Sequence, residues 1–271
     1  MANPKKSNKQ KEEELRLLIQ KRKRIFTMAI TLVIAIIVVI GVVVGSGIMN
    51  SLLPSSSGSN SITSGQFIKM SSSDASTSSG VNIYYLSWGG CPIGASDSWF
   101  IYNYVHTQDP SLKNSTIYNK MHFSDPNESP SNIPGLLFNN FTYTLSGVSY
   151  NFHVIYVYGQ YLPPDGPSSV SSGSAVLKEY FPSSISSLFL KYETQDPTTG
   201  LGGQAIANYA GHLTSSLIVT GPSGTYYAEG ELYNPSSIKG IQPTILIETL
   251  SQYSGITTST SAFGTAVSSV V

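Results

Sequence analysis

The chain has 271 residues, carries a formal net charge of zero and contains a single cysteine, which excludes an internal disulfide framework. Only 11% of the residues are charged, well below the roughly one quarter that is usual in a soluble domain. After Arg24 the chain has six Lys against twelve acidic residues and no Arg, and this balance argues against nucleic-acid binding.

The N-terminal part predicts a membrane anchor. Residues 1–24 hold nine Lys/Arg and three Glu, and the twenty residues 25–44 that follow carry no charge. At about 1.5 Å per residue, an apolar helix of that length crosses the roughly 30 Å hydrocarbon core of a bilayer. We therefore predict a transmembrane segment at residues 25–47. Because basic residues stay on the inner side, we expect a cytoplasmic tail at 1–24 and an extracellular C-terminal part in a single-pass cell-membrane protein.

Two further properties of this segment are open. Gly41 and Gly45 match the small-xxx-small pattern that lets two spanning helices approach closely, which offers a route to a homodimer. The alternative to a retained anchor is a signal peptide that is cleaved after the apolar segment, because cleavage sites need small residues such as Gly45-Ser46-Gly47.

Two segments have a composition that does not predict a packed core. Residues 48–79 are rich in Ser and Gly and lack periodicity, so we expect a flexible linker there, with GQFIKM at 65–70 as a candidate edge strand. Residues 255–271 are rich in Ser, Thr and Val and too short to span a membrane. They are predicted to form a loosely ordered tail.

Between these segments, residues 80–254 have the pattern of an α/β domain. The run VNIYYLSW at 81–88 predicts a buried strand, Gly89 and Gly90 a turn, and Pro92 the start of a helix that runs to about His106. The remaining expected elements, in chain order, are strands at 116–123 and 136–145, a central strand at 150–162, helical segments broken near Pro182, a hairpin at 215–232 and a last helix that ends at Gly255. This order is that of a thioredoxin-like mixed sheet flanked by helices.

The segment SWGGCPIGASDSW at 87–99 resembles the motif of an archaeal thioredoxin-like family of uncharacterised membrane-anchored proteins, domain of unknown function 929. Members of that family show a Cys-Pro-x-Cys-Ala motif followed by Trp, which Cys91, Pro92, Ala95 and Trp99 match. The run HLTSSLIVTGPSGTYYAEGELYNPSSI is similar to the terminal hairpin of the family. The resemblance implies a thioredoxin-like fold for residues 80–254.

Two departures from the family pattern concern catalysis. Gly94 stands where the second motif cysteine is expected, and no proline lies near Ser215 or Ser216, where thioredoxin-like enzymes carry a cis-proline. Disulfide exchange proceeds through a mixed disulfide that a resolving thiol must release, and this chain has none. The family therefore implies the fold without its dithiol chemistry.

Cys91 is the candidate catalytic residue, with Trp88, Pro92 and Trp99 as residues that support the motif. A thiol at a helix N-terminus is expected to have a lowered pKa, which favours a monothiol oxidoreductase that uses an external thiol. Because the chain has neither a resolving cysteine nor the cis-proline, our first hypothesis is a non-catalytic domain that contacts an unidentified envelope protein, and the monothiol oxidoreductase is the alternative. A third is ligand binding in a groove beside the two tryptophans.

The remaining polar residues do not form a recognisable metal or catalytic motif. His122, Asp125 and Glu128 match no metal-site pattern, and Asp125-Pro126-Asn127 predicts a turn instead. We therefore expect no metal and no cofactor. The other histidines, His106, His153 and His212, are scattered along the chain.

Three sequons begin at Asn114, Asn127 and Asn140, in the part of the chain that is expected to lie outside the cell. We predict that these asparagines are glycosylation sites. The sequon at Asn127 is the weakest of the three, because Pro130 follows it.

Overall fold

The centre of the fold is a six-stranded mixed sheet in the order β1-β8-β7-β2-β6-β5. The computed structural model describes residues 61–162 and 166–271. The strands of the sheet are β1 (Ile68–Ser71), β2 (Val81–Ser87), β5 (Phe141–Leu145), β6 (Val148–Tyr156), β7 (Ser216–Gly221) and β8 (Gly224–Glu229). Only β2 and β6 run parallel to each other, and the other neighbouring pairs are antiparallel.

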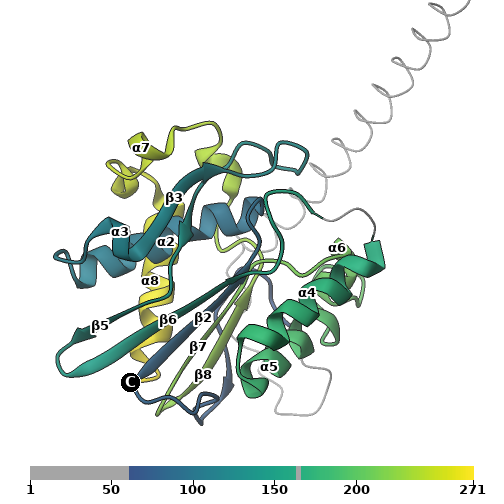
Figure 1. Ribbon diagram of the computed structural model, residues 1–271, viewed down its shortest axis with the longest axis horizontal. Helices are drawn as coiled ribbons and strands as arrows, with labels where there is room; N and C mark the ends of the chain where they lie inside the picture. The colour runs from purple at the N-terminus through teal and green to yellow at the C-terminus, as the bar shows by residue number, and fades with distance from the viewer. Residues whose placement is uncertain (1–60, 163–165) are drawn as a thin grey trace, which may run out of the picture. The chain divides into compact units, whose positions relative to one another are not determined.

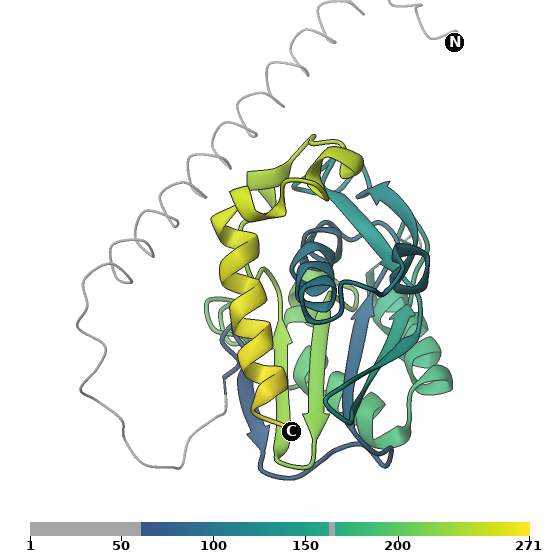
Figure 2. The ribbon, with the colours of Figure 1, turned by 90° about the vertical axis from the view of Figure 1, so that its left-hand side faces the viewer.

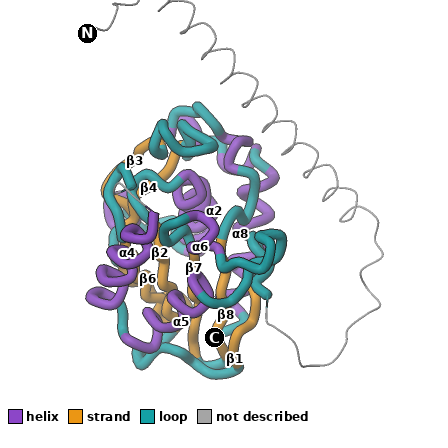
Figure 3. Tube along the Cα trace, turned by 90° about the vertical axis from the view of Figure 1, so that its right-hand side faces the viewer, coloured by secondary structure: helices purple, strands orange, loops and turns teal. Residues whose placement is uncertain are grey.

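Helices cover both faces of the sheet (Figure 1), with α2 and α8 on one face and α4 and α5 on the other. The helices are α2 (Pro92–Gln108), α3 (Asn114–Ile117), α4 (Gly166–Tyr180), α5 (Ser183–Thr194), α6 (Ile206–Ala210), α7 (Pro243–Leu246) and α8 (Ser254–Ser268). Short 3-10 turns lie at Pro235–Ile238 and Leu250–Gln252. The tube in Figure 3 shows α4 and α5 in front of the strands.

The strand β2 is buried along its whole length because both of its faces are covered. Successive side chains of a strand point to opposite faces. Ile83 and Tyr85 pack into the core beneath α2 and α8, whereas Tyr84 and Leu86 pack into the core beneath α4 and α5. A run of apolar residues without alternation is therefore the expected sequence for this position.

A second, two-stranded sheet covers the outer side of α2. Its strands β3 (Tyr118–Phe123) and β4 (Pro134–Phe138) pair in antiparallel fashion. Trp99 of α2 donates its indole N–H to the Pro134 carbonyl at 2.7 Å, and Ser98 accepts the Leu136 N–H at 2.9 Å. These bonds satisfy polar groups in a buried layer and hold α2 in place between the two sheets.

Most predicted elements are confirmed with small shifts, but the single strand predicted at 136–145 is two strands, β4 and β5, which belong to different sheets. The helical break at Pro182 separates α4 from α5, and β7 and β8 form the predicted hairpin. The strand predicted at 150–162 is β6, which ends at Tyr156 and lies next to the edge strand β5 rather than at the centre. The central positions belong to β2 and β7, since β2 pairs with β6 on one side and with β7 on the other.

The C-terminal segment differs from the loosely ordered tail predicted for residues 255–271. It forms the helix α8, which runs along one face of the molecule in Figure 2 and buries Ile256, Phe263 and Val267. Its hydroxyl groups bond to carbonyls one turn back, as Thr260 does to Ile256 at 2.8 Å. Ser and Thr can therefore occupy a helix interior here, and composition alone misrepresents the segment. Gly255 lies inside α8, and the single last helix expected before it is a series of short turns.

The described part of the predicted linker is also bound to the sheet. The candidate strand at 65–70 is confirmed as the edge strand β1, shifted slightly to Ile68–Ser71. Beyond it, Thr220 of β7 donates its hydroxyl to Asp74 and accepts the Ala75 N–H, both at 2.8 Å. Short polar side chains that suggest disorder in the sequence thus serve as hydrogen-bond partners here.

No helix within residues 61–162 and 166–271 combines the length and the apolar character that a bilayer crossing requires. The tail predicted at 1–24 and the anchor predicted at 25–47, with Gly41 and Gly45, lie outside the described residues. The same is true of residues 48–60 of the predicted linker.

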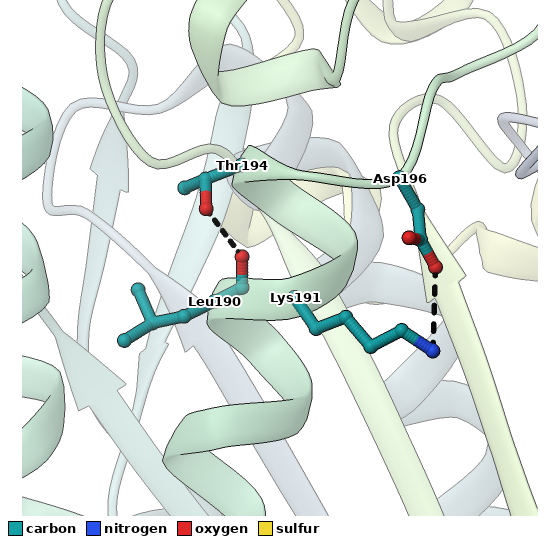
Figure 4. A network of polar contacts seen from close by, with 4 residues as sticks. All are labelled: Leu190, Lys191, Thr194 and Asp196. Atoms are coloured by element: carbon teal, nitrogen blue, oxygen red, sulfur yellow. Dashed lines mark hydrogen bonds and ion pairs between the residues drawn. The ribbon is translucent and has the colours of Figure 1, made fainter.

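The end of α5 is closed by local polar contacts, which Figure 4 shows. The Thr194 hydroxyl donates to the Leu190 carbonyl at 2.5 Å, and the Lys191 ammonium lies 3.6 Å from the Asp196 carboxylate. The chain then continues to Thr198, whose N–H bonds to the Gln204 carbonyl at 2.9 Å. This loop between α5 and α6 forms one wall of the cavity described below.

Candidate functional site

Cys91 is the N-cap residue of α2, directly after the turn that follows β2. Its sulfur accepts a hydrogen bond from the Gly94 N–H at 3.2 Å. Pro92 occupies the first helical turn, where backbone N–H groups have no partner within the helix, so the missing N–H of proline costs no hydrogen bond. Gly90 is required in the turn, because a Cβ atom there would lie 1.9 Å from the Gln160 carbonyl oxygen. The predicted strand-turn-helix with cysteine at the helix start is confirmed.

The environment of Cys91 reverses the expected direction of its pKa. The residue is only 3% exposed, and burial raises the pKa of the thiol to about 12. The Gly94 N–H lowers this pKa and the nearby Asp97 carboxyl raises it, but both effects are smaller than that of burial. The thiol is therefore neutral at physiological pH. Loss of hydration raises the pKa more than the helix N-terminus lowers it, contrary to the expectation from the position of Cys91 in the sequence.

The position of the missing second cysteine is closed by neighbouring side chains. A Cβ atom at Gly94 would lie 2.0 Å from the Ser87 hydroxyl oxygen and 2.9 Å from the Tyr85 hydroxyl oxygen. The Tyr85 hydroxyl also donates to the Gly94 carbonyl at 2.9 Å. Polar groups from β2 thus occupy the space that a second motif side chain would need.

We expect Gly94→Ala to lower the free energy of unfolding by about 1–2 kcal/mol, since the overpacking cost exceeds the helix propensity gained. The double variant S87A/G94A should recover part of this loss, because it removes the nearest atom and leaves the Tyr85 hydroxyl in place. Urea denaturation measures both. Gly159→Ala is the matched control, since a Cβ atom there meets nothing within 4 Å. Unchanged stability of G94A would show that the site has room for a second side chain.

A cavity of about 460 Å³ lies in front of Cys91, beyond the carboxyl end of β2. Open α/β sheets place their ligand sites at this end of the strands. Segments far apart in the sequence supply its principal lining residues, which are Trp88, Cys91, Glu128, Tyr209, His212 and Glu231. The volume is within the range of small-ligand and side-chain pockets.

The ionisable groups in the cavity wall are acidic or neutral. Glu231 is exposed to solvent by its accessible surface, yet partial burial in the cavity wall raises its pKa above the usual range. Burial together with the Asp125 charge raises the pKa of Glu128. Burial lowers the pKa of His212, which favours its neutral form. Neither Lys nor Arg is among the lining residues. The cavity therefore presents two carboxyl groups without a cationic partner from the described residues.

Asp97 lies behind this wall, buried in α2. Burial raises its pKa well above the usual range, and the nearby Glu231 raises it further. The Ser215 hydroxyl donates to one of its oxygens at 3.5 Å. Ser215, at the position where a cis-proline was sought, therefore faces a carboxyl group instead of packing against a pair of cysteines.

Two buried glutamates support the cavity wall from below. Glu193 accepts the Thr214 N–H at 3.0 Å, and Glu229 accepts the Thr198 hydroxyl at 2.6 Å. Both threonines line the cavity. The wall formed by the α5–α6 loop and the start of β7 is thus fixed by carboxyl groups in the core.

The structure separates the two tryptophans that were predicted to share a groove. Trp88 lines the cavity and belongs to the core beneath α4 and α5. Trp99 is fully buried in the other core, beneath α2 and α8. Only Trp88 can contact a ligand at this site. Trp99 holds β4 against α2.

The other candidates do not form a common site. The described residues contain no group of three or more His, Cys, Asp or Glu side chains that could hold a metal ion. His122 is buried beside the Phe123 carbonyl, and burial lowers its pKa to about 4. Asp125 accepts the Asn127 N–H at 2.8 Å, which confirms the predicted turn. Glu128 alone of the three lines the cavity.

The remaining histidines pack against aromatic rings at separate places. His106 stacks on Tyr102 at a ring-centroid distance of 5.5 Å, and His153 stacks on Tyr84 at 4.5 Å. His212 meets Trp88 edge to face at 5.7 Å. Only this last contact belongs to the cavity.

All three sequon asparagines are exposed: Asn114, Asn127 and Asn140. Asn114 accepts the Tyr102 hydroxyl, and Asn140 accepts the Val154 N–H. Asn127 donates its amide to Asp125 at 3.0 Å. Each amide is therefore engaged in a local hydrogen bond at the surface.

Sequence reasoning missed Ser87, Asp97 and Glu231. Asp97 follows Cys91 by six residues on the same helix, and this spacing was a usable signal. Ser87 and Glu231 reach the site through the pairing of β2 with β7 and of β7 with β8. No local pattern in the sequence identifies them.

Comparisons with known proteins agree with the extent of this fold. The family model described as Domain of unknown function (DUF929) matches residues 66–268, from just before β1 to the end of α8. Searches of the curated proteins and of the solved structures found no match. Because the family model covers well over half of the chain, this protein belongs to the DUF929 family.

Proposed function

We propose that residues 66–268 form a thioredoxin-like domain that binds a partner at the cavity and does not exchange disulfides. The sheet order β6-β2-β7-β8, with a parallel first pair and an antiparallel second hairpin, supports the thioredoxin-like assignment. Cys91 lies at the start of α2, the helix that follows β2 in the chain, and this position supports the thioredoxin-like assignment further.

One observation carries the non-catalytic role: the only thiol of the chain is buried. Disulfide exchange needs a thiolate that can reach its target, whereas Cys91 is 3% exposed with a pKa raised by burial to about 12. The closed position at Gly94 supports the same conclusion, because a resolving side chain at position 94 would collide with the Ser87 and Tyr85 hydroxyl groups. The cavity in front of the thiol then serves for binding.

The full-length chain, solubilised in mild detergent, should react with iodoacetamide about a hundredfold more slowly in its native state than in urea, since the thiol is both buried and neutral. The rate is measured by mass spectrometry from pH 6 to 10, with Cys91→Ser as the background control. All signal comes from Cys91, the only cysteine. A native rate with a midpoint well below the free-cysteine pKa of about 8.5 would instead support a monothiol oxidoreductase.

We also propose that the domain is held at the outer face of a cell membrane by residues 25–47 and binds an envelope protein there. The uncharged run and the basic residues 21–24 before it support this topology. The exposure of the three sequon asparagines is compatible with glycans on the same side. Protease protection of residues 1–24 in sealed vesicles, with the domain digested from outside, tests the orientation.

A further inference from the structure

We propose that the cavity binds a lysine side chain of a partner protein, with the lysine ammonium group between Glu128 and Glu231. This inference rests on the binding role proposed above and names the chemistry of the partner. Three separate features of the cavity support it: its charge, its aromatic and apolar walls, and an unused hydrogen-bond donor.

The charge of the cavity favours a cation. Glu128 and Glu231 come from loops that are far apart in the sequence and line the same space. Asp97 lies behind the cavity wall, and its pKa is raised first by burial and then by the nearby Glu231 carboxylate. Since no Lys or Arg lines the cavity, a cationic ligand would relieve this repulsion, whereas an anion would increase it.

The walls fit a long side chain with an apolar stem. Ile93, Leu201 and Ile206 line the cavity together with the acidic groups. A lysine buries its four methylene groups along apolar surface and keeps its ammonium group near polar atoms. The aromatic rings of Trp88 and Tyr209 also line the space, and aromatic faces attract ammonium groups.

The hydrogen-bond donor is the indole N–H of Trp88. The residue is 2% exposed, and this N–H has no hydrogen-bond partner among the described residues. A buried donor without a partner costs free energy, so such groups usually have an explanation. The main-chain carbonyl of a bound peptide would satisfy it. A peptide carries main-chain carbonyl groups next to its lysine side chain, whereas a free amine has none. The Trp88 N–H, unpaired among the described residues, therefore favours a peptide over a free amine as the ligand.

The two indole N–H signals in a proton–nitrogen NMR spectrum provide the test. Trp88 and Trp99 are the only tryptophans, and Trp99 donates to Pro134 inside the other core, so its signal serves as an internal reference. The probe is a capped five-residue peptide, acetyl-Gly-Ser-Lys-Ser-Gly-amide, added to the isotope-labelled full-length chain in detergent. We expect a saturable shift of the Trp88 signal and no shift of the Trp99 signal.

Matched peptides and variants separate the sources of binding. A peptide with norleucine in place of lysine keeps the stem without the charge and should bind at least about tenfold more weakly, which corresponds to about 1.4 kcal/mol. Glu231→Gln should weaken binding of the lysine peptide about tenfold, a change that Glu231→Asp partly restores. Glu179→Gln, an exposed site on α4, makes the same change in net charge away from the cavity and should leave binding unchanged.

The possible results distinguish this inference from the proposed function. Equal binding of the lysine and norleucine peptides, or no effect of E231Q, would overturn the lysine assignment and leave a neutral peptide site. A Trp88 shift with spermidine but not with the lysine peptide would assign the cavity to a free amine and overturn the peptide partner. No shift with any of these probes, together with rapid alkylation of Cys91, would overturn the binding role itself.

Discussion

Replacement of Phe263 by alanine is expected to lower the free energy of unfolding by about 3–5 kcal/mol, the usual cost of removing a fully buried aromatic ring. Phe263 is 0% exposed. Its ring centroid lies 5.8 Å from that of Phe67, 5.7 Å from that of Phe100 and 5.0 Å from that of Tyr104. One side chain thus joins α8, α2 and the segment that leads into β1.

Urea denaturation followed by circular dichroism measures this loss. Thr258→Ala is the control on the same helix, because Thr258 is exposed and such substitutions usually change stability by less than about 0.5 kcal/mol. A loss below about 1 kcal/mol for F263A would mean that α8 does not belong to the core, as the composition of residues 255–271 first suggested.

The second large effect concerns the buried carboxyl groups beneath the cavity wall. Glu193 accepts the Ser216 hydroxyl at 2.7 Å, and Glu229 accepts the Tyr227 hydroxyl at 2.8 Å. Burial and, as the next cause, the neighbouring Glu229 together raise the pKa of Glu193 from 4.5 to about 7. Burial also raises the pKa of Glu229. The two groups therefore titrate as a coupled pair.

We expect stability to fall as pH rises from about 4.5 to 7, by about 3 kcal/mol for Glu193, because the folded state holds its proton over a range where the unfolded state has lost it. Below this window both states are protonated, and above it both are ionised, so the difference in free energy becomes constant. Glu193→Gln has no proton to lose. The stability of the E193Q variant should therefore decline less over the same pH range. The glutamine side chain still offers an acceptor for Thr214 or Ser216.

Urea titrations at half-unit pH intervals, compared between wild type and E193Q, isolate this contribution from those of other acidic groups. Glu179→Gln is the matched control, since Glu179 is exposed on α4 and should follow the wild-type profile. Parallel pH profiles for wild type and E193Q would contradict a raised Glu193 pKa. They would indicate that a cation or water stabilises the ionised pair.

Much of the fold could be predicted because its signals are local. The β-prone run at 81–88, the Gly89-Gly90 turn and Pro92 define a strand, a turn and a helix start within a dozen residues. The hairpin around Pro222-Ser223 and the break at Pro182 are equally local. Such elements depend on the conformational preferences of neighbouring residues, which the sequence states directly.

The helix α8 was missed because its stability comes from elsewhere in the chain. Ser and Thr have poor intrinsic helix propensity, and the segment has the composition of a tail. The contact of Phe263 with Phe100 and Phe67 joins residues more than a hundred positions apart. Tertiary packing provides most of the stability of such a helix, and no window of the sequence contains it.

The sequence by itself determined the family, the order of the central elements and the presence of a single thiol at the start of α2. Only the tertiary structure decided the state of that thiol and the chemistry of the space in front of it. Burial of Cys91 depends on side chains packed around it from other elements, and Glu128 and Glu231 line one cavity only after the chain has folded. The hydration of a side chain and its distance from other charged groups are set by three-dimensional packing. They therefore cannot be predicted from the spacing of residues along the chain.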